Sequence, residues 1–123
     1  MRVVNALILD GYAQSSGSVD SSPLWIGHFT GYSVSVTVSA QSSYGATAKL
    51  QACNDSGNSD GSSGLSNWVD LPNSGATANL TLASDGTQLW NVDGSYYKWI
   101  RVVSTWSAGS ATLNIRANGK GSQ

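Results

Sequence analysis

The sequence is poor in the residues that make helices, charged surfaces and disulfides. Glutamate is absent from the 123 residues, aspartate supplies all seven acidic side chains, and only 11% of residues are charged. Because Glu, Lys and Arg are strong helix formers, their scarcity disfavours helices. No window places apolar residues at the i, i+3, i+4, i+7 spacing of an amphipathic helix. We therefore expect an all-β protein.

Candidate catalytic and metal-binding residues are also few. Cys53 is the only cysteine and His28 the only histidine, too few for a disulfide or a zinc site. His28 lies beside Phe29 in an apolar run, which favours packing over catalysis. The aspartates mostly stand beside Gly, Ser or Asn, which is typical of turns and not of paired catalytic carboxylates. We predict that the chain is not an enzyme and holds no cofactor.

Charge and hydropathy exclude two further classes of partner. The net charge is -1 and the six cations are scattered, so there is no basic stripe for direct binding of nucleic acid. No apolar run approaches the roughly 18 residues of a membrane helix, and the first ten residues predict a strand and not a signal peptide. The loop Asn54–Gly64 spaces side-chain oxygens as a calcium loop does, but it lacks the leading Asp and the closing bidentate Glu. It predicts an exposed loop without a metal.

Alternation of apolar and polar residues predicts about eight strands. It is clearest in Tyr32–Ala40 and continues in Ala46–Cys53, and a polar loop is expected at Ala13–Ser22. Shorter candidate strands are Val3–Leu9, Leu24–Thr30, Trp68–Leu71, Thr77–Ala83 and Gln88–Val92. Together they predict one antiparallel, jelly-roll-like β-sandwich domain over residues 1–123. Its core is expected to contain Val34, Val36, Val38, Leu50, Leu80, Ile100, Val102, Leu113 and Ile115.

The segment Tyr96–Asn118 predicts a closing β-hairpin, because two runs rich in β-branched and aromatic residues flank a short Ser/Gly break. In the first run, Trp99 and Trp106 are an odd number of residues apart and therefore lie on opposite faces. One core between two sheets cannot bury both rings. We predict that one of the two rings, with Tyr96 or Tyr97, meets another subunit or partner, so the candidate interface residues are Tyr96, Tyr97, Trp99 and Trp106. The alternative is that further strands of the same chain cover both faces.

The second half of the chain carries a series of short motifs at Leu50–Asp55, Asn67–Pro72, Leu89–Asn91, Tyr97–Val102 and Gly109–Ile115. This series resembles small β-sandwich structural proteins of bacteriophage virions, of the kind that decorate or cement a capsid. The resemblance implies a non-enzymatic virion protein, a homo-oligomer that binds the major capsid protein or other virion proteins. Capsid surface, vertex, fibre and tail all stay open as its position.

A second function is compatible with the same residues. Discoidin-like and sugar-binding sandwiches share a Tyr-x-Trp/Tyr-x-Arg strand, which is present here as Tyr97, Trp99 and Arg101. Five tryptophans are many for this length, and exposed aromatic rings stack on sugars as well as on protein partners. The alternative is therefore a carbohydrate-binding β-sandwich module, either free or as a receptor-binding part of a virion fibre or tail.

Overall fold

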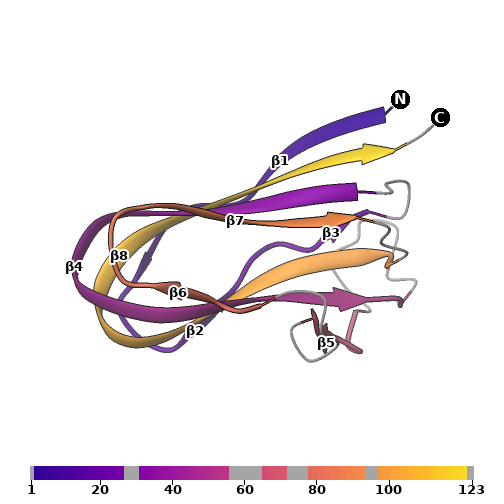
Figure 1. Ribbon diagram of the computed structural model, residues 1–123. Coiled ribbons are helices and arrows are strands. Elements are labelled where there is room, and N and C mark those ends of the chain that lie inside the picture. Colours follow the sequence, from indigo (N-terminus) through magenta and orange to yellow (C-terminus); the bar gives the residue numbers. More distant parts are fainter. Residues whose placement is uncertain (1, 27–30, 56–64, 72–77, 94–96, 122–123) are drawn as a thin grey trace.

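The computed structural model is built from β-strands, with no α-helix in the part of the chain that it describes (Figure 1). It describes residues 2–26, 31–55, 65–71, 78–93 and 97–121. The strands are β1 (Arg2–Gln14), β2 (Ser18–Asp20), β3 (Leu24–Trp25), β4 (Gly31–Cys53), β5 (Val69–Asp70), β6 (Leu80–Leu82), β7 (Gly86–Asp93) and β8 (Trp99–Gly121). The all-β prediction is confirmed.

Two long strands, β4 and β8, organise the fold. Each has 23 residues, and they pair antiparallel along their whole length, from Gly31 opposite Lys120 to Cys53 opposite Trp99. The strands β1, β2 and β3 follow the free edge of β8, while β7, β6 and β5 follow the free edge of β4. All pairs are antiparallel, and the described strands together form one hydrogen-bonded sheet.

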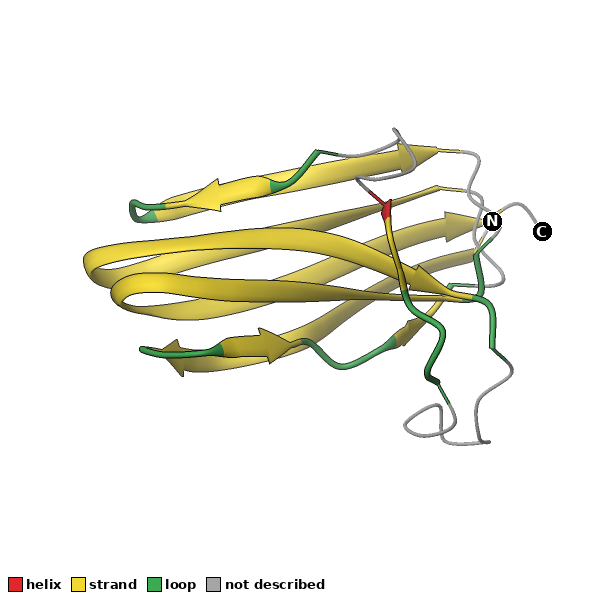
Figure 2. Cartoon of the chain, turned by 90° about the horizontal axis from the view of Figure 1, so that it is seen from below, coloured by secondary structure: helices red, strands yellow, loops and turns green. Residues whose placement is uncertain are grey.

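This sheet is folded across itself, so that its two halves face each other as a sandwich (Figure 2). The first half-sheet contains β1, residues 110–121 of β8, residues 31–39 of β4, and β7. The second half-sheet contains the other ends of β4 and β8 with β2, β3, β5 and β6. The start of β1 and the end of β8 lie at the end opposite the bend (Figure 1).

The bend is a coordinated change of direction in neighbouring strands. Its residues take up left-handed backbone conformations: Gly109 in β8 has φ of 66°, Ala40 and Ser43 in β4 have φ of 53° and 49°, and Gly17 before β2 has φ of 65°. The register between β4 and β8 shifts between Ser39 and Ala46. Such local irregularities let paired strands turn together without ending the sheet.

The core lies between the two half-sheets and follows the alternation in the sequence. Along β4, Tyr32, Val34, Val36 and Val38 point inward and are at most 5% exposed. Eight of the nine predicted core residues are at most 3% exposed, and Leu80 is partly buried against the same cluster. Burying these aliphatic side chains contributes about 1.5–3 kcal/mol each to the folding free energy.

The predicted closing hairpin is wrong, because the two runs that flank the Ser/Gly break do not pair with each other. Residues 99–121 form the single strand β8, which passes through the bend and pairs with β4 on both sides of it. The expected separate strands Tyr32–Ala40 and Ala46–Cys53 are likewise one strand, β4. A Ser/Gly segment can form either a hairpin turn or a bend within one strand. Here the neighbouring strand β4 has its own irregularity beside the segment, so the two strands bend together.

The N-terminal boundaries also differ from the prediction. The strand β1 does not end at Asp10 but continues to Gln14, with register shifts between Leu7 and Leu9 and between Leu9 and Tyr12. The expected loop at Ala13–Ser22 contains β2. Of the expected strand Leu24–Thr30, the structure describes β3 and Ile26, and residues 27–30 lie outside the described residues.

Candidate functional site

The outer face of the second half-sheet gathers most of the tryptophans of the chain. In β8, Ile100 and Val102 point into the core, so Trp99 and Arg101 point outward. The neighbouring strand β3 places Trp25 directly opposite Trp99. Trp68, just before β5, lies over Arg101. We call the surface formed by Trp25, Trp68, Trp99 and Arg101 the Trp/Arg face.

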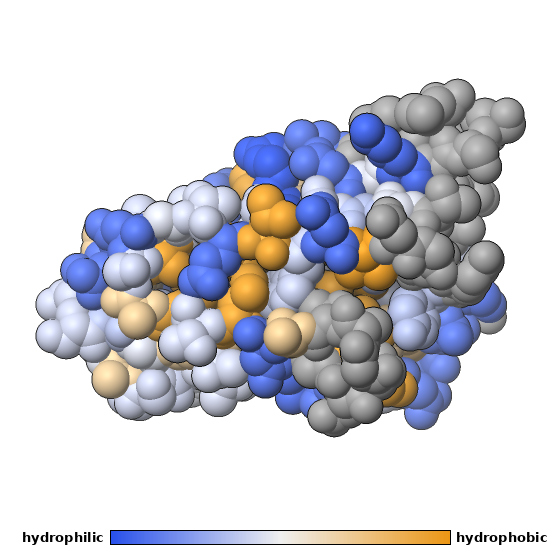
Figure 3. Space-filling model, viewed as in Figure 1, coloured by the Kyte–Doolittle hydropathy of each residue, from blue (hydrophilic) through white to orange (hydrophobic). Residues whose placement is uncertain are grey.

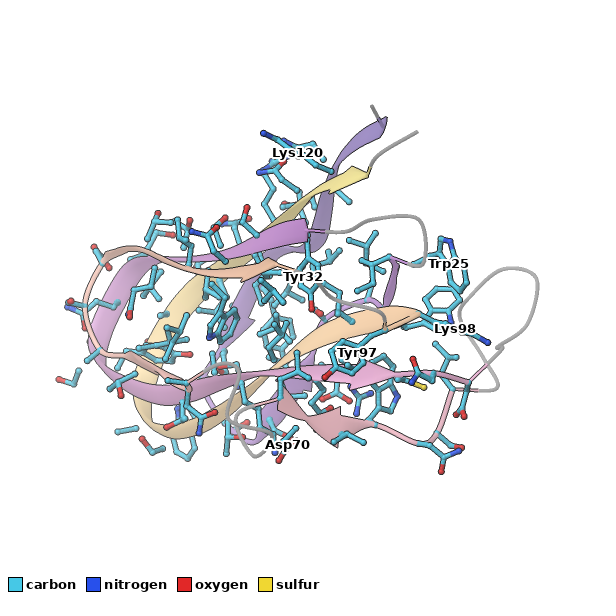
Figure 4. All side chains as sticks on the ribbon, turned by 45° about the vertical axis from the view of Figure 1, so that its right-hand side comes forward. Trp25, Tyr32, Asp70, Tyr97, Lys98 and Lys120 are labelled. Carbon is cyan, nitrogen blue, oxygen red and sulfur yellow. The ribbon has the colours of Figure 1, made fainter. Side chains whose placement is uncertain are left out.

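The aromatic rings of this face contact one another. The rings of Trp25 and Trp99 meet edge to face, with centroids 5.1 Å apart and an interplanar angle of 70°. The Trp99 indole Nε1 donates a hydrogen bond to the backbone oxygen of Asp55 at 3.1 Å. Trp99 is therefore only 8% exposed, whereas Trp25 is 37% exposed. Figure 4 shows Trp25 and Lys98 at the end of the molecule opposite the bend.

A row of polar side chains crosses the second half-sheet beside these rings. The Arg101 guanidinium lies 4.2 Å from the centroid of the Trp68 ring, a cation–π geometry. Its Nη1 is 3.3 Å from Asp20 Oδ2, and its Nε donates to Gln51 Oε1 at 2.8 Å. Gln51 Nε2 donates to Asp70 Oδ1 at 2.6 Å.

Lys49 completes the row at 3.1 Å from Asp70 Oδ2. We call Asp20, Arg101, Gln51, Asp70 and Lys49 the polar row. Its two cations and two carboxylates balance, so the face offers no net positive charge to a polyanion. The Trp/Arg face and the polar row together present aromatic rings beside hydrogen-bonding groups that are held in fixed positions.

The polar row makes stability depend on pH. The Gln51 amide and then the Lys49 ammonium hold the pKa of Asp70 below its ordinary value. Because the pKa is lower in the folded state, Asp70 stabilises the fold above about pH 4, and this contribution is lost as the pH falls through the folded-state pKa. We expect Asp70→Asn to lower the free energy of unfolding at pH 7 and to make its decline below pH 4 shallower. Urea unfolding from pH 7 to pH 2 measures both.

Asp10→Asn is the matched control, because Asp10 is an exposed carboxylate on β1 outside the polar row. It should leave both the stability at pH 7 and the acid slope close to those of the unchanged protein. An Asp70→Asn protein that loses stability in acid as steeply as the unchanged protein contradicts the assignment.

A pocket of about 280 Å3 opens beside the Trp/Arg face. It lies at the end of β4, and the residues that line it are Ala52, Cys53, Asn54, Asp55, Asn67, Val69 and Tyr97. Val69 is the most exposed large apolar residue among those described, at 58%.

The Asp55 carboxylate organises the polar wall of this pocket. It accepts hydrogen bonds from the backbone nitrogens of Ser66 and Asn67 at 2.9 and 3.0 Å, and from the Asn67 side-chain amide. The Asn67 side chain, followed by these backbone donors, lowers the pKa of Asp55 strongly. Asp55 is therefore ionised at neutral pH and holds together two parts of the chain that are 11 and 12 residues apart.

The structure describes three of the four candidate interface residues, and Trp99 and Trp106 lie on opposite faces. Tyr96 lies outside the described residues. Trp99 belongs to the outer face, whereas Trp106 and Tyr97 are partly buried against the core. The Trp106 indole also donates to the backbone oxygen of Gly109 at 2.8 Å. The two tryptophans lie on opposite faces, as alternation requires, and their role in association stays a prediction.

Sequence reasoning did not place Trp25, Trp68 and Arg101 at the site. The Tyr-x-Trp-x-Arg pattern already puts Arg101 on the same face as Trp99, two residues further along one strand. Trp25 and Trp68 carry no such local signal. Trp25 reaches this face because β3 pairs with β8, more than 70 residues later in the chain, and Trp68 because β5 pairs with β4.

Candidate metal ligands do not gather in the described part of the chain. No group of three or more His, Cys, Asp or Glu that could hold a metal ion occurs among them. His28 and most of the loop Asn54–Gly64 lie outside the described residues. No helix in the described part of the chain has the length and apolarity needed to cross a membrane.

Comparison with known proteins gives likeness of fold. No protein-family model and no curated protein sequence matches the chain. The VP2 subviral particle of infectious bursal disease virus matches with a TM-score of 0.55 and 14% identity, over 98% of this chain and 33% of that one. A structure of the Gx strain of the same virus matches with a TM-score of 0.53 and 13% identity, over 97% of this chain and 32% of that one.

The SPBc2 prophage-derived protein YomS matches over most of both chains. Its TM-score is 0.55 at 8% identity, covering 96% of this chain and 94% of YomS. This chain therefore spans about a third of the viral chains but nearly all of the prophage-derived one. The likeness in fold to proteins of viral origin, which the sequence predicted, is confirmed.

Proposed function

We propose that this chain is a non-enzymatic structural protein of a virus particle, and more narrowly a decoration or cement protein that binds the assembled shell. The observation that supports this most is the likeness in fold to YomS over nearly the full length of both chains, together with the likeness to VP2. The location of the chain is then the virion, and its partners are the major capsid protein or other virion proteins.

The Trp/Arg face is the surface that we assign to the shell. Trp and Arg are the residues that most often dominate binding energy at protein interfaces. Here Arg101 is held in place by the ring of Trp68 and by Gln51, so little side-chain entropy is lost on binding. A decoration protein meets many identical sites on one particle, so a modest contact at each site suffices.

The direct experiment is to find the protein in particles. Particles from a lysate of the source organism are separated on a density gradient, and an antiserum against the purified chain is used to probe the fractions. The proposal expects the chain in the particle band, in a fixed ratio to the major shell protein. If the chain stays entirely at the top of the gradient while particles band normally, the proposal fails.

Two tryptophan substitutions test which face binds. Trp25→Ala should weaken particle binding by about 2 kcal/mol, or roughly thirtyfold in Kd, and should lower the free energy of unfolding by only about 1 kcal/mol through the lost ring contact with Trp99. Trp106→Ala should instead lower the free energy of unfolding by about 2–4 kcal/mol, because its ring packs against the core. Cosedimentation with particles and urea unfolding measure the two effects. If Trp25→Ala binds particles as tightly as the unchanged protein, the Trp/Arg face is not the surface that binds the shell.

Carbohydrate binding is the second candidate, and the pocket at Tyr97 favours it. There an aromatic ring lies with the side chains of Asn54 and Asn67, the types of group that contact sugar rings and hydroxyls. Most hydrogen-bonding capacity of Asp55 is used within the chain, which leaves fewer groups for a sugar. A glycan array probed with the purified chain tests this function, and binding that Tyr97→Ala abolishes would support it.

A further inference from the structure

The strand β7 is an edge of the first half-sheet. Among the described residues it pairs on one side only, with β4, from Gly86 opposite Val38 to Asp93 opposite Gly31. Its eight pairs follow one another without a register shift. No charged residue and no proline occurs from Gly86 to Val92. The outward-pointing backbone N–H and C=O groups of such a strand are available to another strand.

The other edges of the described sheet are protected against such pairing. The strand β1 forms the opposite edge of the first half-sheet, and its register shifts twice, between Leu7 and Leu9 and between Leu9 and Tyr12. The edge strands of the second half-sheet, β2, β3, β5 and β6, have only two or three residues each. Bulges and short strands are two ways in which proteins block edge-to-edge pairing. Among the described strands, β7 is the longest edge without a register shift, with eight consecutive pairs against six at the start of β1.

The side chains of β7 are divided between the core and the surface. Trp90 points inward, is 5% exposed, and donates from Nε1 to the backbone oxygen of Ala78 at 2.7 Å. Leu89 points outward and is 54% exposed. Figure 3 shows apolar side chains reaching the surface on the side of the molecule where β7 and β6 lie. Burying this exposed leucine, which lies in the uncharged stretch Gly86–Val92 of an edge strand, in an interface would be favourable.

We propose that β7 pairs antiparallel with β7 of a second copy of this chain, forming a closed dimer about a two-fold axis normal to the first half-sheet. Centred on Leu89, this pairing places Leu89 against Leu89 of the partner subunit and Thr87 against Asn91 of the partner subunit. The two first half-sheets then become one continuous sheet with their outer faces on the same side.

A second copy fits this edge because the edge is complementary to itself. From Gly86 to Val92 every facing pair is uncharged, and the facing carboxylates of Asp93 and Asp85 of the partner subunit lie only at the two ends of the pairing. The symmetric mate also covers Leu89 with an equally apolar side chain. Because a two-fold pairing uses the same β7 edge of both chains, no β7 edge is left over and assembly through it stops at two.

Sedimentation of the purified full chain tests the proposal without any virus particle, so its outcome is independent of the proposed virion role. The unchanged protein should sediment as a dimer that dissociates on dilution. Leu89→Lys should raise the dimer dissociation constant at least about tenfold, because two lysines then meet at the axis. Leu7→Lys is the matched control. Leu7 is 40% exposed and lies in the same cross-strand row, through Arg116 and Ser35, but on the β1 edge.

A cysteine substitution gives a second measurement that does not depend on weakening the fold. Leu89→Cys should form a covalent dimer under oxidising conditions, because facing residues of paired strands are within disulfide reach. Leu7→Cys should not, and Cys53 is 2% exposed and adds no background. Any one of four results would overturn the proposal. They are a chain that stays monomeric at all concentrations, an unchanged chain larger than a dimer, a Leu7→Lys variant that dissociates as much as Leu89→Lys, and the absence of a covalent dimer with Leu89→Cys.

Discussion

Replacing Gly109 with alanine is expected to lower the free energy of unfolding by about 4 kcal/mol or more, enough to prevent folding. Gly109 lies at the bend of β8 with φ of 66°, and a Cβ there would overlap the backbone oxygens of Ser42 and Ser43. Both obstacles are backbone atoms of β4, which cannot move aside unless the paired bend moves with them. Urea unfolding followed by tryptophan fluorescence measures the loss, and circular dichroism shows whether the variant folds.

The Gly17→Ala variant separates two effects at the bend, which are the steric overlap of a new Cβ and the cost of the left-handed backbone conformation. Gly17 lies at the same bend with φ of 65°, but nothing stands within 4 Å of its missing Cβ. Alanine should therefore cost only about 1–2 kcal/mol there, the cost of a left-handed conformation for a residue with a side chain. Equal losses at Gly109 and Gly17 would mean that the close approach of β8 to β4 does not constrain the bend.

The strand alternation in the sequence predicted the core because that signal is local. Val34, Val36 and Val38 alternate with serine and threonine, and in a sheet with one buried face this alternation fixes which residues point inward. The same rule correctly placed Trp99 and Trp106 on opposite faces. These inferences need only the residues of one strand, so they succeed without knowledge of the partners.

The bend and the candidate site depend on partners far away in the chain, and local patterns could not reveal them. The break at residues 107–109 becomes a bend and not a hairpin because it lies against Ser42 and Ser43, more than 60 residues earlier. The stacking of Trp68 on Arg101 likewise joins two segments without a shared motif. The alternation in the sequence predicts which side chains share a face of a strand. Which partner covers each face depends on contacts between strands that are distant in the sequence.

The role of Gln14 could not be predicted from the residues around it in the sequence. It lies in a segment that looks like a polar loop, yet it is 1% exposed beside the bend. Its Oε1 accepts from the Tyr44 hydroxyl at 2.6 Å and from the Ser104 hydroxyl at 2.9 Å, and its Nε2 donates to the Ser104 backbone oxygen at 2.9 Å. Burial raises the pKa of Tyr44 above its ordinary value, so the hydroxyl stays protonated as a donor.

This network joins β1, β4 and β8 at the bend, and its removal should be costly. Gln14→Met keeps the length of the side chain but leaves the hydroxyls of Tyr44 and Ser104 without their common acceptor. Each buried polar group left unsatisfied costs about 1–3 kcal/mol. We therefore expect Gln14→Met to lower the free energy of unfolding by about 2–4 kcal/mol in urea unfolding at pH 7.

A double-mutant cycle with Tyr44→Phe distinguishes lost hydrogen bonds from lost packing. Tyr44→Phe alone removes one donor, while Gln14 keeps the bonds to Ser104. In the double variant no Tyr44 hydroxyl remains to be left unsatisfied, so the total loss should be smaller than the sum of the two single losses by about 1 kcal/mol or more. If the two losses simply add, Tyr44 and Gln14 act independently, and the cost of Gln14→Met comes from packing at the bend and not from the shared hydrogen bond.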